Sequence, residues 1–501
     1  MPVARDPVDV VVVGSGFGGS VTANRLALAG KRVLVLERGP WRDSLPVRSM
    51  GVQRRAPFPY GSKALSHALR AVHRGRLQLR LNSAGLFELF LFPGVCAVVG
   101  SAVGGGSTAY GGLLERPRNA ALWHGRHPEL DPGSVERYYD KVVADMGGVL
   151  LTRQHVLPQS VWTHFSDTLG RRCSAAERQP HMALLIPPSP ADAGRTIDWR
   201  GVQRQYCAFD GDSFLGSRGG AKASVDFVYL APVLDKGVTV RDLCQVTRVR
   251  RARPVDGGGY LVQFTDLANG VESVARAGSV VLAAGTMNTL QLLFASASPQ
   301  DGLAPMPALG QGFSTNGDLV AVWHRASAAV SSFTSTPSHG SFVIRGYEAA
   351  TFGMGGLPGF QTLPLPAVVK RKLEKRFFMY GIGVDSGNGS VRCEAGRLRV
   401  EYDQRNEPIF EEVRAAFRTL ETETGDQCWV PRRPITVHPG GGARVSADDN
   451  HGVVDHRGQV HRNPGLFVAD GSVLPAAVGG PPALAIAAWA HHVADGIAEA
   501  V

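Results

Sequence analysis

Residues 8–20, VDVVVVGSGFGGS, indicate the fold class of this 501-residue chain. Residues 8–13 form a short apolar run rich in β-branched valine, typical of a fully buried parallel strand. Glycines 14, 16 and 19 follow in GxGxxG spacing. The pattern then predicts a helix over residues 18–29 and a second buried strand over residues 32–36. Together these make a βαβ unit within the first forty residues.

Each glycine of this turn has a physical role in dinucleotide binding. Gly14 permits the tight turn, Gly16 lets the backbone approach a pyrophosphate, and Gly19 lets helix and strand pack closely. The helix N-terminus would then offer free N–H groups to the phosphates. Glu37 ends the second strand, where an acid accepts a hydrogen bond from a ribose 2′-hydroxyl. A glycine turn without a nucleotide is the alternative, and the turn does not distinguish NAD from FAD.

The remaining chain alternates between patterned segments and glycine clusters. Residues 100–112 (GSAVGGGSTAYGG) form a second glycine loop, whose backbone either lies against a flat ring system or makes a structural turn. Residues 42–93 are basic and read as a cover segment, and residues 320–430 as a second, sheet-bearing domain. Further helices are expected over residues 63–81, 130–147, 221–234 and 483–498, and from Gly285 onward. Further strands are expected over residues 238–240, 246–249, 260–264 and 279–283.

Composition excludes several classes of protein. The net charge of +10 comes from scattered arginines rather than a patch or tail, so nucleic acid is not an expected partner. Six cysteines occur without CxxC spacing, which argues against zinc and for free thiols; no metal site is expected. Proline and glycine interrupt both long uncharged stretches, so neither is a credible spanning helix. We expect a soluble, cytoplasmic protein, with a weak contact of the basic segment with a membrane surface as an alternative.

Four segments carry a resemblance to a known family. They are VVVGSGFGGSV (11–21) with Glu37, VVGSAVGGGSTAYGG (98–112), VVLAAGTMNTLQLL (280–293) and the block from residue 435 to the end. The loop LGQGFSTNGD (309–318) matches as well. The chain resembles the glucose–methanol–choline (GMC) flavin oxidoreductases, and within them the cholesterol oxidase branch. Residues 42–93 and 320–430 match poorly.

The resemblance implies non-covalently bound FAD, because no histidine in the second glycine loop is placed for a covalent flavin bond. Tyr110 stands where the family usually has Asn. The implied contacts with the pyrophosphate are Gly14, Gly16, Phe17, Gly18 and Gly19, with Glu37 at the ribose and Val246 at the adenine. The implied contacts along the ribityl chain and the flavin are Gly105, Gly106, Ser107, Tyr110, Gly111 and Gly112. Further implied cofactor residues are Gly285, Asp470, Gly471 and Pro482.

The implied active site centres on His438 in TVHPGGG (436–442), which resembles the family's histidine element. That histidine would orient a substrate hydroxyl and support its deprotonation while hydride leaves for the flavin. Pro481 stands where the family usually places Asn or His. Proline has no side-chain donor and no N–H. We expect that a group from residues 320–430 or from the substrate supplies the missing hydrogen bond. The alternative is that the enzyme catalyses a reaction other than simple alcohol oxidation.

Other polar residues are weaker candidates. His491 and His492 lie inside the last helix and read as structural, as does Asp385. Glu348 aligns poorly with a buried glutamate of cholesterol oxidases and reads as a surface or hydrogen-bonded side chain.

The expected fold is α/β. A Rossmann-like FAD domain is assembled from residues 1–48, 94–150, 205–320 and 430–501. The substrate domain and cover segments, residues 49–93, 151–204 and 321–429, hold an antiparallel sheet capped by helices. The expected function is removal of hydride from the CH–OH group of a large apolar alcohol, of sterol, terpenoid or polyketide type, with O₂ or a redox partner as acceptor. A flavoenzyme catalysing rearrangement, cyclisation or desaturation is the alternative, and a non-catalytic flavoprotein is a second one.

Overall fold

The computed structural model describes residues 8–500 except 76, 153–154, 156, 158–172, 176–178, 254, 256, 299–301 and 326–329. Its central element is a seven-stranded sheet with the order β12-β2-β1-β15-β14-β13, to which β25 adds beside β15. The strands are β1 (Val8–Val13), β2 (Val33–Leu36), β12 (Val238–Arg241), β13 (Cys244–Arg251), β14 (Tyr260–Asp266), β15 (Val271–Leu282) and β25 (Leu466–Val468).

The pairing of this sheet explains the valine run. β1 pairs in parallel with β2 and β15, and its residues Val10, Val11 and Val12 are fully buried. β12 and β25 also pair in parallel, whereas β14 pairs antiparallel with β13 and β15. The inner parallel strands β1, β2 and β25 are buried on both faces, which is why they carry no alternation of polar and apolar residues.

A second, six-stranded sheet is antiparallel throughout, with the order β23-β17-β20-β19-β18-β8. Its strands come mainly from residues 319–429, as expected for a second sheet-bearing unit. They are β8 (Cys173–Ala175), β17 (Leu319–His324), β18 (His339–Ile344), β19 (Ala350–Gly355), β20 (Arg376–Gly383) and β23 (Gln427–Trp429).

A third sheet has five strands in the order β24-β6-β5-β3-β4. It consists of β3 (Leu69–Arg74), β4 (Leu77–Arg80), β5 (Phe87–Leu91), β6 (Cys96–Gly100) and β24 (Ile435–Thr436). Three smaller sheets are formed by β7 (Leu113–Leu114) with β9 (His181–Met182), by β10 (Thr196–Trp199) with β11 (Val202–Gln205), and by β16 (Gln311–Phe313), β21 (Gly389–Glu394) and β22 (Arg397–Glu401).

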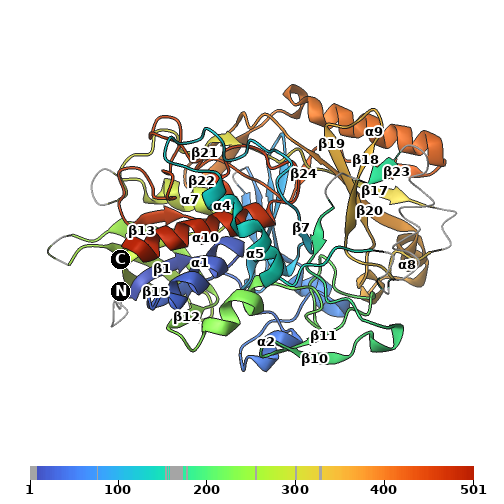
Figure 1. The fold of residues 1–501 in the computed structure, drawn as a ribbon, viewed down its shortest axis with the longest axis horizontal. Helices are drawn as coiled ribbons and strands as arrows, with labels where there is room; N and C mark the ends of the chain where they lie inside the picture. The colour runs from blue at the N-terminus through green and yellow to red at the C-terminus, as the bar shows by residue number, and fades with distance from the viewer. Residues whose placement is uncertain are drawn as a thin grey trace.

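Helices cover these sheets. Figure 1 shows α10, in red, lying along α1, in blue, with the two ends of the chain on the same side of the molecule; the two helices are in contact. α9 packs on β19 and β20 of the second sheet. The helices are α1 (Phe17–Leu28), α2 (Leu45–Ser49), α3 (Ala64–His67), α4 (Gly133–Glu136), α5 (Tyr138–Asp145), α7 (Thr286–Ser296), α8 (Ala367–Glu374), α9 (Pro408–Thr424) and α10 (Ala483–Ala500).

The prediction of a helix over residues 63–81 is wrong. After a short helical turn, α3, the chain forms the antiparallel hairpin β3–β4, which turns at Gly75 with φ +57°. Leu77, Leu79 and Leu81 recur every second residue, and β3 has a parallel partner in β5. Tertiary pairing therefore overrides the local helical composition. The alternative of a membrane contact relied on this stretch forming a basic amphipathic helix, and β3 and β4 occupy most of it instead.

The segment 221–234 is also only partly helical. Helical structure begins at a π-helical turn, η4 (Asp226–Leu230), and continues as a 3₁₀ turn, η5 (Ala231–Val233). The residues before it bond as extended chain, with Ala223 N–H donating to the Ala183 carbonyl. The strand expected over 279–283 is longer, because β15 pairs with β14 from Val271 onward. No helix within the described residues is long and apolar enough to span a membrane.

Candidate active site

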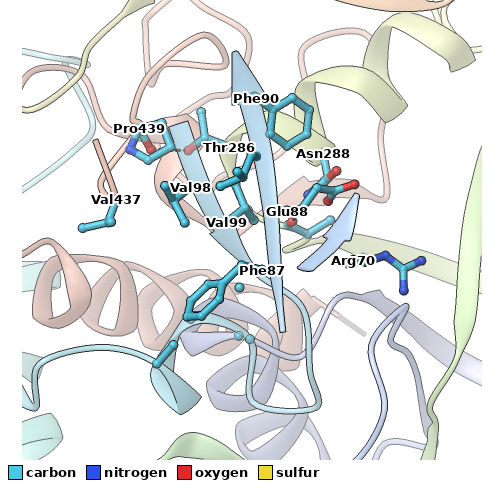
Figure 2. Close-up of a pocket in the computed structure, with 18 of the residues that line it drawn as sticks. Arg70, Phe87, Glu88, Phe90, Val98, Val99, Thr286, Asn288, Val437 and Pro439 are labelled. Atoms are coloured by element: carbon cyan, nitrogen blue, oxygen red, sulfur yellow. Dashed lines mark hydrogen bonds between the residues drawn. The ribbon is translucent and has the colours of Figure 1, made fainter. Parts of the chain in front are cut away.

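A cavity of about 1200 Å³ runs between the three large sheets. Figure 2 shows Val437 and Pro439 at one side of this cavity and Glu88 and Arg70 at the other, with strands of the five-stranded sheet crossing between them. Ligand pockets usually measure about 300–1,000 Å³. The cavity therefore exceeds the usual size for a single drug-sized ligand.

The first glycine turn lines this cavity, and its glycines meet different surroundings. Gly14 has φ +94°, and a Cβ on it would lie 2.4 Å from the Ala283 carbonyl oxygen. A Cβ on Gly18 or Gly19 would strike backbone oxygens at 1.8 and 2.0 Å, so these two residues permit close packing of helix and strand. A Cβ on Gly16 would instead meet nothing nearer than the Gly105 Cα at 3.9 Å. Gly16 therefore leaves room for a ligand against the backbone.

The second glycine loop touches the first. A Cβ on Gly105 would lie 2.7 Å from the Gly16 Cα, whereas Gly106 faces open space within the cavity lining. Ser107 is fully buried behind the loop, where its hydroxyl donates to the Gly104 carbonyl and accepts from the Val225 N–H.

Hydrogen bonds from Lys222 and to Ala223 hold the end of the second loop. Lys222, fully buried, donates from Nζ to the carbonyls of Tyr110 and Ser213 at 2.7 Å each, and burial lowers its pKa to about 7. The Tyr110 hydroxyl donates to the Ala223 carbonyl, and its ring meets Phe17 edge-on. Gly111 lines the cavity, and Gly112 lies behind it against Lys222.

Glu37 is engaged by protein donors. One carboxylate oxygen accepts from the Ser15 N–H and hydroxyl at 2.9 and 2.8 Å, and the other from the Gly39 N–H at 2.7 Å. The side chain thus ties the glycine turn to the end of β2 while it lines the cavity. Val246, on β13, lines the same end.

A charged cluster next to Glu37 was missed by the sequence reasoning. Glu88 forms ion pairs with Arg38 and with His73, the latter at 2.7 Å. Burial opposes ionisation of Glu88, but Arg38 and His73 outweigh it and lower its pKa to about 2. Arg38 also donates to Asn288 on α7 at 3.1 Å. Arg38 follows β2, His73 lies on β3 and Glu88 on β5, so no local sequence pattern indicates this cluster.

Asp470 fixes the start of α7. Its carboxylate accepts from the Gly285 N–H and from Thr289, as well as from the N–H and hydroxyl of Ser472. Burial raises the pKa of Asp470. Gly285 has φ +78°, and a Cβ on it would meet nothing within 4 Å. Asp470, Gly285, Gly471 and Pro482 all line the cavity, although they are far apart in the chain.

His438 lies at the other end of the cavity and is oriented by Asp318. The Nδ1 of His438 is 2.9 Å from Oδ2 and 3.0 Å from Oδ1 of Asp318. The same carboxylate accepts from the Thr436 hydroxyl at 2.9 Å and from the Val437 N–H at 3.2 Å. A carboxylate only accepts, so Nδ1 carries the proton of this bond and Nε2 is left as the acceptor in the neutral ring.

Sequence reasoning missed Asp318 as a partner of His438, because 120 residues separate the two. The only signal was that Asp318 ends the loop 309–318. That loop is anchored by Asp385, which accepts from the hydroxyls of Ser314, Thr315 and Tyr402 at 2.6, 2.9 and 2.8 Å. The structural reading of Asp385 is therefore confirmed.

Pro481 lines the cavity as well, and Asn316 holds the loop that carries it. The Asn316 side-chain oxygen accepts from the N–H groups of Val478 and Gly479, and its amide donates to the Gly480 carbonyl. Asn316 has φ +60°, a backbone conformation that Asn tolerates better than most residues. The loop is thus clamped directly before the proline.

The remaining candidates lie away from the cavity. His491 is buried in α10 and stacks on Tyr138 with ring centroids 4.9 Å apart, and burial lowers its pKa to about 4. His492 donates from Nε2 to the His456 carbonyl. Glu348 lies on the surface, where it accepts from the Gly346 N–H. None of the three belongs to the cavity lining within the described residues.

The cavity fits a dinucleotide cofactor together with a second, smaller ligand. Gly16, Gly106 and Gly285 leave open space where side chains would otherwise fill it, and the first turns of α1, α7 and α10 contribute to its wall. Helix N-termini carry free N–H groups and a positive dipole end, which favour phosphate.

Comparison with known proteins agrees with this geometry. The N-terminal GMC oxidoreductase family model matches residues 8–316, and the C-terminal model matches residues 397–490. The chain is 23% identical to a cholesterol oxidase of Acinetobacter baumannii, over 97% of this chain and 93% of that protein. It is also 23% identical to the long-chain-alcohol oxidase FAO4B of Arabidopsis thaliana, over 100% of this chain and 68% of that protein.

Two solved structures of similar fold are also oxidases. Pyridoxine 4-oxidase from Mesorbium loti superposes with a TM-score of 0.62 at 17% identity, covering 98% of this chain and 99% of that one. A fungal aryl-alcohol oxidase gives 0.57 at 14% identity, covering 99% and 100%. The α/β fold with a Rossmann-like unit and an antiparallel second sheet is thereby confirmed. The chain belongs to the GMC oxidoreductase family and is an FAD-dependent oxidoreductase.

Proposed function

We propose that this enzyme oxidises a fairly large apolar alcohol at its CH–OH carbon, with His438 as the acid/base. The observation that carries the proposal is the pair formed by Asp318 and His438 at the wall of the cavity. This pair presents Nε2 as a proton acceptor beside a largely apolar space. An alcohol gives up hydride far more readily as its hydroxyl proton departs, and a positioned acid/base contributes roughly 10²–10⁴-fold.

The proton and electron balance is simple. The substrate O–H bond breaks and its proton moves to Nε2 of His438, while the negative charge of Asp318 stabilises the imidazolium that forms. The C–H bond breaks as hydride, for which bound FAD supplies the acceptor. The product is the carbonyl compound.

The residues that would hold FAD follow from the cavity wall. Gly16 and the start of α1 would bind the pyrophosphate, Glu37 the ribose, and the strand around Val246 the adenine. The Gly105–Gly106 turn, Gly111, the start of α7 and Asp470 would lie along the ribityl chain and the flavin. The flavin would be held non-covalently.

The substrate end of the cavity supports an apolar substrate. Its wall contains Phe214, Phe360 and Phe378, with the rings of Phe214 and Phe378 5.0 Å apart. Leu357 and Val320 extend the same surface. Burying apolar surface contributes about 25 cal/mol per Å². A sterol, terpenoid or polyketide alcohol would gain most from such a wall.

Three further features remain predictions. We expect O₂ as the electron acceptor, a redox partner being the alternative that oxygen uptake would distinguish. We expect a cytoplasmic protein. The division into residues 1–48, 94–150, 205–320 and 430–501 for FAD and the remainder for substrate and cover segments is likewise a proposal.

The test is anaerobic mixing of the purified enzyme with a panel of hydroxylated lipids while flavin absorbance is followed. Reduction by one class of alcohol is expected in the wild type. His438→Ala should retain FAD but reduce the flavin at least ~10²-fold more slowly. Reduction of the variant at the wild-type rate would rule out the proposed role of His438.

Pro481 keeps the second hypothesis, a rearrangement, cyclisation or desaturation, open to test. Pro481→Asn should change little if another group compensates, and should raise activity on simple alcohols if the chemistry differs. Product analysis decides between them, because alcohol oxidation shows a net two-electron change per turnover and a rearrangement shows none.

A further inference from the structure

The end of the cavity around His438 is short of backbone hydrogen-bond donors. Pro439, Pro481 and Pro482 line it and have no N–H. The N–H of His438 donates to the Thr436 hydroxyl at 2.9 Å, and that of Val437 donates to Asp318. A substrate oxygen that loses its proton to Nε2 gains negative charge, which a hydrogen-bond donor stabilises. A side-chain hydroxyl can supply that donor.

Two hydroxyl groups line the same cavity and have no assigned role. They belong to Tyr380 and Ser338, whose oxygens are 3.2 Å apart. In the strand register Val320 lies opposite Tyr380 and Leu319 opposite Gly381. Side chains alternate along strands, so Tyr380 and Val320 emerge on one face. Asp318 directly precedes β17 and lines the same cavity.

The Tyr380 ring is held in place from both sides. It lies over Gly353 on the neighbouring strand β19, where a Cβ would come within 2.2 Å of the ring and its oxygen. Ser338 packs against Gly111 of the second glycine loop, 3.1 Å from the position of a Cβ there. The hydroxyl pair therefore stands between the second sheet and the loop assigned to the flavin.

Tyr380 is a donor at neutral pH. Burial is the main cause that raises its pKa well above the ordinary value, and the charges of Glu115 and Asp318 raise it further. Tyr380 lines the same cavity as Asp318 and His438. If Ser338 donates to the phenol oxygen, the Tyr380 proton is free to point into the cavity.

We propose that the Tyr380 hydroxyl, oriented by Ser338, donates a hydrogen bond to the oxygen of an alcohol bound at His438. The inference rests on the proposed function for the identity of the ligand as an alcohol. The substrate proton goes to His438, and Tyr380 keeps its own. Tyr380 would thereby provide the polar contact that Pro481 cannot.

The first test measures binding without turnover. The probe is 2-phenyl-2-propanol, which has a hydroxyl group but no hydrogen on its carbinol carbon and so cannot be oxidised; cumene is the matched hydrocarbon. Affinities for the oxidised, FAD-loaded enzyme are read from the flavin absorbance change. The wild type should prefer the alcohol, and Tyr380→Phe should lose about tenfold of that preference, the value of one hydrogen bond.

Controls keep the result interpretable. Tyr260→Phe removes a buried hydroxyl that donates to the Pro464 carbonyl at 2.9 Å, outside the cavity lining, and should leave the preference unchanged. If Tyr380→Phe does not fold or retain FAD, Ser338→Ala decides, because it should weaken the preference through Tyr380. An unchanged preference in the folded variant, or a wild type that binds both probes equally, overturns the proposal.

The second readout separates this proposal from the proposed function. With an oxidisable alcohol, Tyr380→Phe should lower the limiting rate of flavin reduction about tenfold, because the bond strengthens as negative charge develops. If no alcohol reduces the wild-type flavin but the binding preference is present and lost in Tyr380→Phe, the proposed function fails and this inference stands.

Discussion

The bond from His438 to Asp318 determines which ring nitrogen faces the cavity. Asp318→Asn replaces an obligatory acceptor with an amide whose NH₂ group competes for the same partners. We expect the variant to retain FAD and to reduce its flavin about 10²-fold more slowly, because the neutral ring loses its fixed tautomer. Stopped-flow absorbance with the physiological alcohol measures this. A loss confined to KM would contradict it, since a fixed tautomer acts on the chemical step.

The open space at Gly16 leads to a second prediction at the scale of one residue. Gly16→Val would fill the place of the pyrophosphate, so the purified variant should lack the yellow flavin of the wild type. Gly211→Val is the matched control, because a Cβ on Gly211 would meet nothing within 4 Å and Gly211 does not belong to the cavity lining. Flavin absorbance relative to protein measures both. Full flavin content in Gly16→Val would exclude this turn as the pyrophosphate site.

The helical turn η4 carries a buried acid that makes stability depend on pH. Burial raises the pKa of Asp226 from 3.8 to about 6. The folded protein therefore keeps this proton to higher pH than the unfolded chain, and stability is lost as pH rises between 3.8 and about 6. Asp226→Asn should be more stable than the wild type at pH 8, and the gain should be smaller at pH 4.5 by about 2 kcal/mol.

Denaturant unfolding at the two pH values measures this gain for Asp226→Asn. The exposed Asp235→Asn is the control for removal of one negative charge and should show no such difference. A gain of Asp226→Asn that is equal at both pH values would mean that the buried carboxyl is ionised throughout.

At the scale of the whole molecule, the cavity joins three sheets. Residues of the two glycine loops, the start of α7 and the HPGGG segment line it together, and Thr286 on α7 donates to the Pro439 carbonyl at 2.6 Å. A cofactor bound in the cavity should therefore stabilise the entire fold. At free FAD 100-fold above its Kd the expected gain is about 2.7 kcal/mol. The apparent Tm of apoprotein should rise with added FAD, whereas that of Gly16→Val should not.

Local patterns in the sequence determined the first glycine turn and the strands and helices around it. The valine run predicts β1, the glycine spacing predicts the turn at Gly14–Gly19, and the start of α7 follows the same logic at Gly285. These features depend on backbone conformation and burial within a few residues, which composition and spacing encode directly.

Only the tertiary structure decided the rest. The hairpin β3–β4 exists because β5 supplies a partner strand, although its sequence looked helical. The pairing of His438 with Asp318, the cluster around Glu88 and the Tyr380–Ser338 pair join side chains from separate strands and loops. Such contacts are set by sheet register and packing across the whole chain, so no spacing in the sequence specifies them.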